Sequence, residues 1–100
     1  MESHIIQNCT GFDWDVGNVE KNQKKHHASR WECEQIFFNE PLLIYHDEGH
    51  SKVESRYFAL GHTDLNRELM IVFTVRTHLI RIISARPMSK KERKYYEQAE

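Results

Sequence analysis

A strand followed by a basic helix is predicted in the sequence Ile80-Arg81-Ile82-Ile83-Ser84-Ala85-Arg86-Pro87-Met88-Ser89-Lys90-Lys91-Glu92-Arg93-Lys94-Tyr95-Tyr96. The run from Ile80 to Arg86 is mostly β-branched or small, as in a buried strand, yet it contains two arginines. A guanidinium cannot lose its proton and is costly to bury alone, so such a strand usually faces an anion. That anion could belong to a bound phosphate or to a carboxylate of the protein, and the pattern leaves both alternatives open.

Capping boxes mark where two helices begin. In each box a serine is followed three residues later by a glutamate, so that side chains and backbone N–H groups satisfy each other. The boxes are Ser29 with Glu32 and Ser89 with Glu92. The helix after Ser29 is expected to end at Pro41, and a further helix is expected from Asp15, which can cap it, to about Lys25.

Strand-like runs are distributed along the rest of the chain. They are Gly11–Trp14, Leu42–His46, Arg56–Leu60, Glu68–Val75 and Leu79–Arg86, and Gly61 is expected to stop the third. The run Glu68–Val75 is solidly apolar and is therefore expected at the centre of a sheet. Short connections at His62–Asn66 and Arg76–His78 predict antiparallel hairpins. The predicted order is β-α-α-β-β-β-β-α, an α+β fold with helices packed on an antiparallel sheet.

Length and composition predict one small domain. A chain of 100 residues forms a single core, and residues 1–10 are expected to be a loosely ordered lead-in. With 39% hydrophobic and 29% charged residues, the chain has the composition of a globular protein rather than a disordered one. No apolar run approaches the roughly 18 residues of a membrane span, and no signal-peptide layout is present, so the expected location is the cytoplasm.

The net charge of −1 conceals a basic C-terminal part. Between Arg76 and Glu100, seven lysines and arginines stand against three glutamates, a balance of +4. The segment Lys21–Arg30 is also basic and contains no acid. Two basic segments on a nearly neutral chain indicate a local anionic partner rather than general coating of nucleic acid, although two solvated helix faces would give the same pattern.

Metal and serine chemistry find little support in the sequence. Two histidines flank acids in His46-Asp47-Glu48-Gly49-His50, but Gly49 predicts a loop and no third ligand is evident. Ser84 lies within a strand rather than on a glycine-bounded elbow, and no glycine-rich phosphate loop is present. We therefore predict neither a metal nor a cofactor.

Cleavage of RNA without a metal suits the residues better. The 2′-hydroxyl needs a base, the leaving 5′-oxygen needs an acid, and the transition state needs fixed cations. The predicted catalytic residues are Lys25, His26, Arg56, Arg81, Arg86 and Tyr96, and the predicted substrate-binding residues are Lys24, Lys90, Lys91, Arg93 and Lys94. Arg56 and Arg86 are expected to clamp the scissile phosphate, with Arg81 as a second clamp or a structural partner. Proton transfer is expected from Lys25, His26 or Tyr96.

Strand alternation restricts this site. Arg81 and Arg86 are five residues apart, so an unbroken strand would point them to opposite faces. Either a bulge brings them to one face, or only one arginine serves the site while the other pairs with a carboxylate. Tyr95 and Tyr96 are adjacent, so one is expected to pack on the sheet and the other to be exposed.

Several blocks of the chain, taken in order, resemble the BrnT family of ribonuclease toxins. The blocks are Phe12-Asp13-Trp14-Asp15, Asn22-Gln23-Lys24-Lys25-His26, Glu54-Ser55-Arg56, Arg81-Ile82-Ile83-Ser84-Ala85-Arg86 and Glu92-Arg93-Lys94-Tyr95-Tyr96. The resemblance implies a RelE-like microbial ribonuclease fold and toxic RNA cleavage that inhibits translation and growth. It also implies a co-encoded BrnA-type antitoxin, which is a ribbon-helix-helix protein. The toxin would contact operator DNA only through this antitoxin. The predicted catalytic residues match motif positions, but His27 replaces the glycine that usually follows the Lys-His pair.

The same residues also allow a non-catalytic alternative. A basic module could dock nucleic acid or an acidic protein segment without cleaving it. No ionised general base is evident near the arginines in the sequence, which keeps this alternative open.

Overall fold

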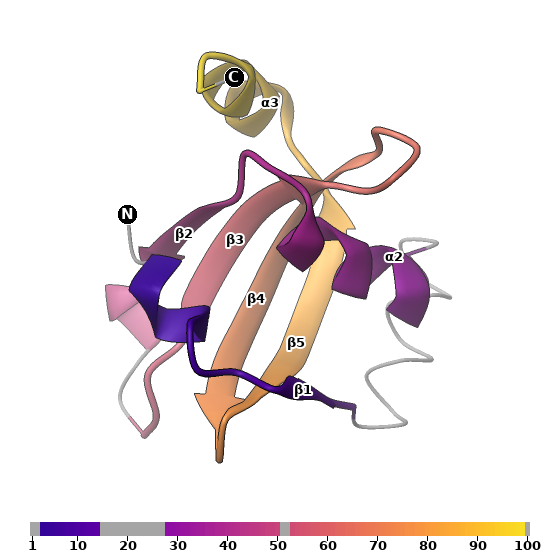
Figure 1. Cartoon of the computed structure of the whole chain (residues 1–100). Helices are drawn as coiled ribbons and strands as arrows, with labels where there is room; N and C mark the ends of the chain where they lie inside the picture. Colours follow the sequence, from indigo (N-terminus) through magenta and orange to yellow (C-terminus); the bar gives the residue numbers. More distant parts are fainter. Residues whose placement is uncertain (1–2, 15–27, 51–52, 100) are drawn as a thin grey trace.

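The computed structural model describes residues 3–14, 28–50 and 53–99, and its centre is a five-stranded sheet. The strands lie in the order β1-β5-β4-β3-β2 (Figure 1). Their bounds are β1 Gly11–Asp13, β2 Leu43–His46, β3 Tyr57–His62, β4 Glu68–Arg76 and β5 Leu79–Pro87. The predicted α+β class is confirmed, and β4, which was predicted to be central from its apolar run, is central.

The sheet is mixed, so the prediction of an antiparallel sheet is wrong at one edge. The pairs β2–β3, β3–β4 and β4–β5 are antiparallel, and the last two are joined by the short connections that were predicted. Strand β1 instead pairs with β5 in parallel, with Phe12 opposite Ile80. A hairpin fixes the direction of the strands that it joins, whereas β1 is followed by a long connection, so no local signal sets its direction.

Both predicted capping boxes are present. Helix α2 (Arg30–Gln35) begins after Ser29, whose hydroxyl accepts a hydrogen bond from the N–H of Glu32, while the Glu32 side chain accepts one from Ser29. Helix α3 (Lys90–Glu97) begins in the same way after Ser89. These two helices therefore start where local side-chain chemistry requires.

Three short 3₁₀ turns complete the described elements: η1 (Ser3–Ile6), η2 (Ile36–Phe38), which continues α2, and η3 (Glu48–His50). The helix predicted at residues 15–25 lies outside the described residues, so the full predicted order of elements and the RelE-like architecture stay predictions. In the described part of the chain, every helix is too short or too polar to cross a membrane.

Gly61 does not stop β3 as predicted, because the strand continues through it to His62. A Cβ atom at this position would lie 2.9 Å from the Cβ of Ile36 in η2, closer than real side chains approach. The glycine is therefore required by the close approach of η2 to the sheet and not by a turn.

The sheet has one covered face and one open face. In Figure 1, α2 and η2 lie in front of the covered face, where the main core forms. On the other side, α3 covers one end of the sheet, where Tyr96 packs with Leu43, Leu60 and Met88. We call this second side the open face. It carries the side chains that alternate with the main core, which include Tyr45, Phe58, Val72, Arg76, Arg81, Ser84 and Arg86.

Candidate functional site

A β-bulge interrupts β5 between its two arginines. Val72 of β4 lies opposite Ser84, but the next residue, Phe73, lies opposite Ile82. Ile83 is therefore an extra residue with no partner of its own in the register. An inserted residue reverses the alternation of the strand beyond it.

The reversal places both arginines on the open face. The buried residues of β5 are Ile80 and Ile82 before the bulge and Ala85 after it. Even-numbered residues therefore face the core before the bulge, and odd-numbered residues face it afterwards. Arg81 precedes the bulge and pairs with Thr74, and Arg86 follows it and pairs with Met70. Of the two alternatives that strand alternation left open, the structure contains the bulge.

An arginine cluster surrounds one carboxylate at the end of the open face where β5 begins. Arg76 binds Glu54 through two hydrogen bonds, from Nε to Oε2 at 2.8 Å and from Nη2 to Oε1 at 2.8 Å. The pKa of Glu54 is held below its ordinary value, first by the hydrogen bonds from Arg76 and further by the positive charges of Arg76, Arg56 and Arg81. Glu54 is therefore ionised at neutral pH, and its carboxylate is a candidate base that the sequence did not single out.

The sheet register explains why Arg56 and Arg81 share this end. The carbonyl oxygen of Arg56 accepts a hydrogen bond of 2.8 Å from the N–H of Asp47, which extends the β2–β3 ladder by one step. The Thr74 hydroxyl donates a hydrogen bond of 2.7 Å to the carbonyl of Ser55, the residue before Arg56. Thr74 is also the β4 partner of Arg81, so the two arginines lie at the same level of the sheet. Arg81 also pairs with Asp13 of β1, Nη1 to Oδ2, at 3.4 Å.

Arg86 lies at the other end of the open face. Thr74 and Met70, the β4 partners of Arg81 and Arg86, are about 13 Å apart along the strand at about 3.3 Å per residue. The register groups Arg56 with Arg81 rather than with Arg86, so the clamp of one phosphate by Arg56 and Arg86 stays a prediction that this arrangement does not favour.

Arg86 is instead held by α3. Its Nη1 and Nη2 atoms donate to Oε1 and Oε2 of Glu92 at 2.8 and 2.9 Å. The pKa of Glu92 is lowered, first by the hydrogen bonds from Arg86, so the pair is ionic. Both arginines of β5 thus have carboxylate partners. This agrees with the alternative that the anion facing this strand is a carboxylate of the protein.

Tyr96 does not reach the surface, so its predicted catalytic role stays a prediction that its burial does not favour. The side chain is fully buried, and its hydroxyl donates to the carbonyl of Pro41 and lies 2.7 Å from Nδ1 of His62. Its neighbour Tyr95 is 52% exposed. The prediction that one of the two tyrosines packs on the sheet while the other is exposed is confirmed.

The other predicted residues fall into two groups. Lys24, Lys25 and His26 lie outside the described residues. The cations of α3 are exposed, and among them Arg93 approaches Glu68, Nε to Oε1, at 3.6 Å. Lys91 lines a pocket beside the sheet.

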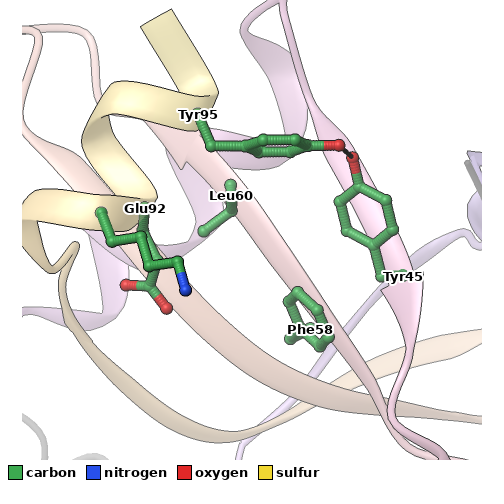
Figure 2. Close-up of a pocket in the computed structure, with 6 residues that line it drawn as sticks. Tyr45, Phe58, Leu60, Glu92 and Tyr95 are labelled. Carbon is green, nitrogen blue, oxygen red and sulfur yellow. Dashed lines mark hydrogen bonds between the residues drawn. The ribbon is translucent and has the colours of Figure 1, made fainter.

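This pocket contains two aromatic residues that the sequence did not single out, Tyr45 and Phe58. It encloses about 370 Å³ and is lined by Tyr45, Phe58, Leu60, Lys91, Glu92 and Tyr95 (Figure 2). The hydroxyl oxygens of Tyr45 and Tyr95 lie 2.7 Å apart. Burial, together with the hydrogen bond to Tyr95, raises the pKa of Tyr45 to about 12. These residues come from β2, β3 and α3, so only the fold brings them together.

The site can now be set beside what is known of other proteins. Within the described residues, no group of three or more histidine, cysteine or acidic side chains is arranged to hold a metal ion. A family model described as the ribonuclease toxin BrnT of type II toxin–antitoxin systems matches residues 14–92. No curated protein matches the chain.

Proposed function

The chain belongs to the BrnT family of ribonuclease toxins of type II toxin–antitoxin systems, and we propose that it cleaves RNA without a metal ion at the arginine cluster of the open face. One observation carries this proposal. Arg56, Arg76 and Arg81 gather around the ionised carboxylate of Glu54, so a base and fixed cations lie side by side. Such cleavage would inhibit translation and growth.

The proposed reaction uses the ribose itself as the nucleophile. The 2′-oxygen forms a bond to the adjacent phosphorus while the bond to the 5′-oxygen breaks, which leaves a 2′,3′-cyclic phosphate and a 5′-hydroxyl. Glu54 accepts the proton of the 2′-hydroxyl, because only two of the roughly four lone-pair sites of its carboxylate are used by Arg76. Lys25 and His26 remain the proposed donors of the proton that the 5′-oxygen requires.

The arginines have the charge that the transition state requires. In the described part of the chain, the three arginines of the cluster bring fixed positive charge to one end of the open face before the substrate binds. Preorganised cations stabilise the charge that builds up on the phosphoryl oxygens. We propose that Arg56 and Arg81 contact the scissile phosphate and that Arg76 orients Glu54.

Arg86 has a different proposed role. Because both of its Nη atoms bind Glu92, it positions α3 against the sheet and lies about 13 Å from the rung of Arg81 along the strand. Lys90, Lys91, Arg93 and Lys94 of that helix are proposed to follow the RNA backbone beyond the cleaved bond. Their contribution would be electrostatic and would weaken with salt.

The proposed partner is a BrnA-type ribbon-helix-helix antitoxin that covers the open face, and the toxin would contact operator DNA only through it. A ribonuclease toxin acts on RNA inside the cell, so we propose a single-domain protein of the cytoplasm with no membrane partner and no cofactor.

Incubating the purified protein with RNA in EDTA tests the activity most directly. Cleavage in EDTA with 2′,3′-cyclic phosphate ends is expected, and Arg81→Ala should lose it. Arg30→Ala is the matched control, because Arg30 is also an arginine paired with a carboxylate, but it lies on α2. RNA binding without cleavage would support the non-catalytic binding module instead. Activity that disappears in EDTA and returns with magnesium or zinc would overturn the metal-free mechanism.

A further inference from the structure

We propose that the pocket between Tyr45 and Tyr95 binds one unpaired base of the RNA. This inference rests on the proposed function, since it assigns a subsite for the same substrate on the same face. The pocket lies on the rungs between the two arginines of β5: Phe58 is opposite Val72, and Val72 is opposite Ser84. A strand of RNA that passes from the arginine cluster to α3 therefore crosses it.

The pocket has the size and composition of a small-molecule site. Its volume of about 370 Å³ falls within the roughly 300–1,000 Å³ of ligand pockets. Leu60 and the aromatic rings supply apolar walls, and Lys91 and Glu92 supply polar groups at the α3 side (Figure 2). A flat, largely apolar ligand with polar edges is suited to such a lining.

The aromatic rings are held in fixed positions. Tyr45 stacks on Phe58 with ring centroids 5.4 Å apart and an angle of 29° between the planes. The ring of Tyr95 lies 6.2 Å from that of Tyr45, and the two hydroxyl groups meet at one corner of the pocket (Figure 2). Because Tyr95 is 52% exposed, part of its ring is accessible for stacking. Unpaired bases are commonly recognised by stacking on such rings.

Charge identifies the occupant as a nucleotide rather than an apolar peptide side chain. Lys91 lines the pocket, and Lys90 and Lys94 are exposed on the same helix. Arg81 and Arg86 are on the same face of the sheet. Glu92 also lines the pocket, but it is paired with Arg86, so the lysines of α3 leave this border cationic. An apolar pocket with such a border suits a ligand that has an apolar base and an anionic backbone.

The test uses RNA that cannot be cleaved. A fluorescein-labelled hexanucleotide with 2′-O-methyl riboses is compared, by fluorescence anisotropy, with an abasic chain of the same length and charge. The wild-type protein is expected to bind the base-bearing chain about 10-fold more tightly. Tyr95→Leu should remove most of that difference and leave binding of the abasic chain unchanged, whereas Tyr95→Phe should retain it. Phe38→Leu is the control, because Phe38 is 78% exposed on η2, over the opposite face.

Equal affinity of the wild-type protein for the two chains would overturn the proposal, as would a full base preference in folded Tyr95→Leu. Photocrosslinking of the wild-type protein to a 5-iodouridine oligonucleotide gives an independent readout. Crosslinks mapped to Tyr45, Phe58 or Tyr95 are expected, and crosslinks confined to other residues would contradict the pocket.

Cleavage of ordinary RNA is scored separately. RNA cleavage without base preference would reject this subsite alone, and base-dependent binding without cleavage would reject the proposed activity alone.

Discussion

Arg86 and Glu92 join the last strand to the last helix through two parallel hydrogen bonds of 2.8 and 2.9 Å. The same glutamate accepts the hydrogen bond from the Ser89 N–H that begins α3. One carboxylate therefore caps the helix and fixes its position on the sheet. The tyrosine that closes the aromatic pocket is carried by this helix, so the ion pair and the pocket are mechanically connected.

A double-mutant cycle should measure the coupling between Arg86 and Glu92. Arg86→Ala and Glu92→Gln are each expected to lower the free energy of unfolding, with a coupling energy of about 1 kcal/mol. The value is modest because the side chain of Arg86 is 37% exposed and water screens the pair. Glutamine still serves a capping box, so Glu92→Gln removes the charge while it preserves the helix start. Urea denaturation of the four proteins provides the measurement, and additive effects would show that the pair contributes no coupling.

Acid should weaken the protein through the same pair. The pKa of Glu92 is lower in the folded protein than its ordinary value of 4.5, so the group stabilises the fold above that pH. This contribution is lost as the pH falls below 4.5 toward the folded-state pKa. Glu92→Gln should therefore show a shallower loss of stability below pH 4.5 than the wild type in thermal melts across that range. Parallel curves for the two proteins would contradict the assignment.

Features that depend on a few neighbouring residues were predictable from the sequence. The serine and glutamate of each capping box are close in the chain, and the structure contains both boxes at Ser29 and Ser89. The apolar character of Glu68–Val75 predicted the central strand, and β4 does lie between β3 and β5. Short connections likewise fixed the antiparallel pairing of β3, β4 and β5.

Features that depend on pairing between distant segments were not predictable. The bulge at Ile83 exists only relative to the register of β4, so its position is not encoded in the composition of β5. Arg76 meets Glu54, and Tyr45 meets Tyr95, only after the sheet has formed. The sequence therefore singled out Arg56 and Arg81 of the candidate site, but not Arg76, Glu54 or the aromatic pocket.

Arg56→Lys should separate binding from turnover. Lysine keeps the positive charge but cannot present the two parallel N–H groups that a phosphate can accept from arginine. The variant is expected to keep most of its affinity for 2′-O-methyl RNA and to lose about 100-fold in kcat on ordinary RNA. Single-turnover cleavage together with anisotropy binding separates the two quantities. Equal rates for the variant and the wild type would indicate that Arg56 serves only an internal ion pair.

Glu54→Gln tests the proposed base. The amide cannot accept the proton of the 2′-hydroxyl, so kcat should fall by about 100-fold or more while non-cleavable RNA binds at least as tightly. Because the pKa of Glu54 is lowered, kcat/KM of the wild type should not decline through loss of this base until the pH is below 4.5. The variant should lack that decline. A pH–rate profile shared by the two proteins would remove Glu54 from the mechanism.

Co-expression with the product of the neighbouring small gene should rescue growth and yield a complex without ribonuclease activity. An interface that covers the open face would bury about 1,600 Å² or more and exclude RNA. Complementary charge mainly speeds association, so reversing Lys90 and Lys94 to glutamate should slow complex formation more than it speeds dissociation. Arg30→Glu, on α2, is the control and should leave the association rate unchanged.

Pull-down from co-expressing cells, followed by an RNA cleavage assay and stopped-flow binding, tests each step. Full activity in the recovered complex would show that inhibition does not work by covering this face. The toxin role itself would be contradicted if no partner were recovered and expression of the protein alone left growth unaffected.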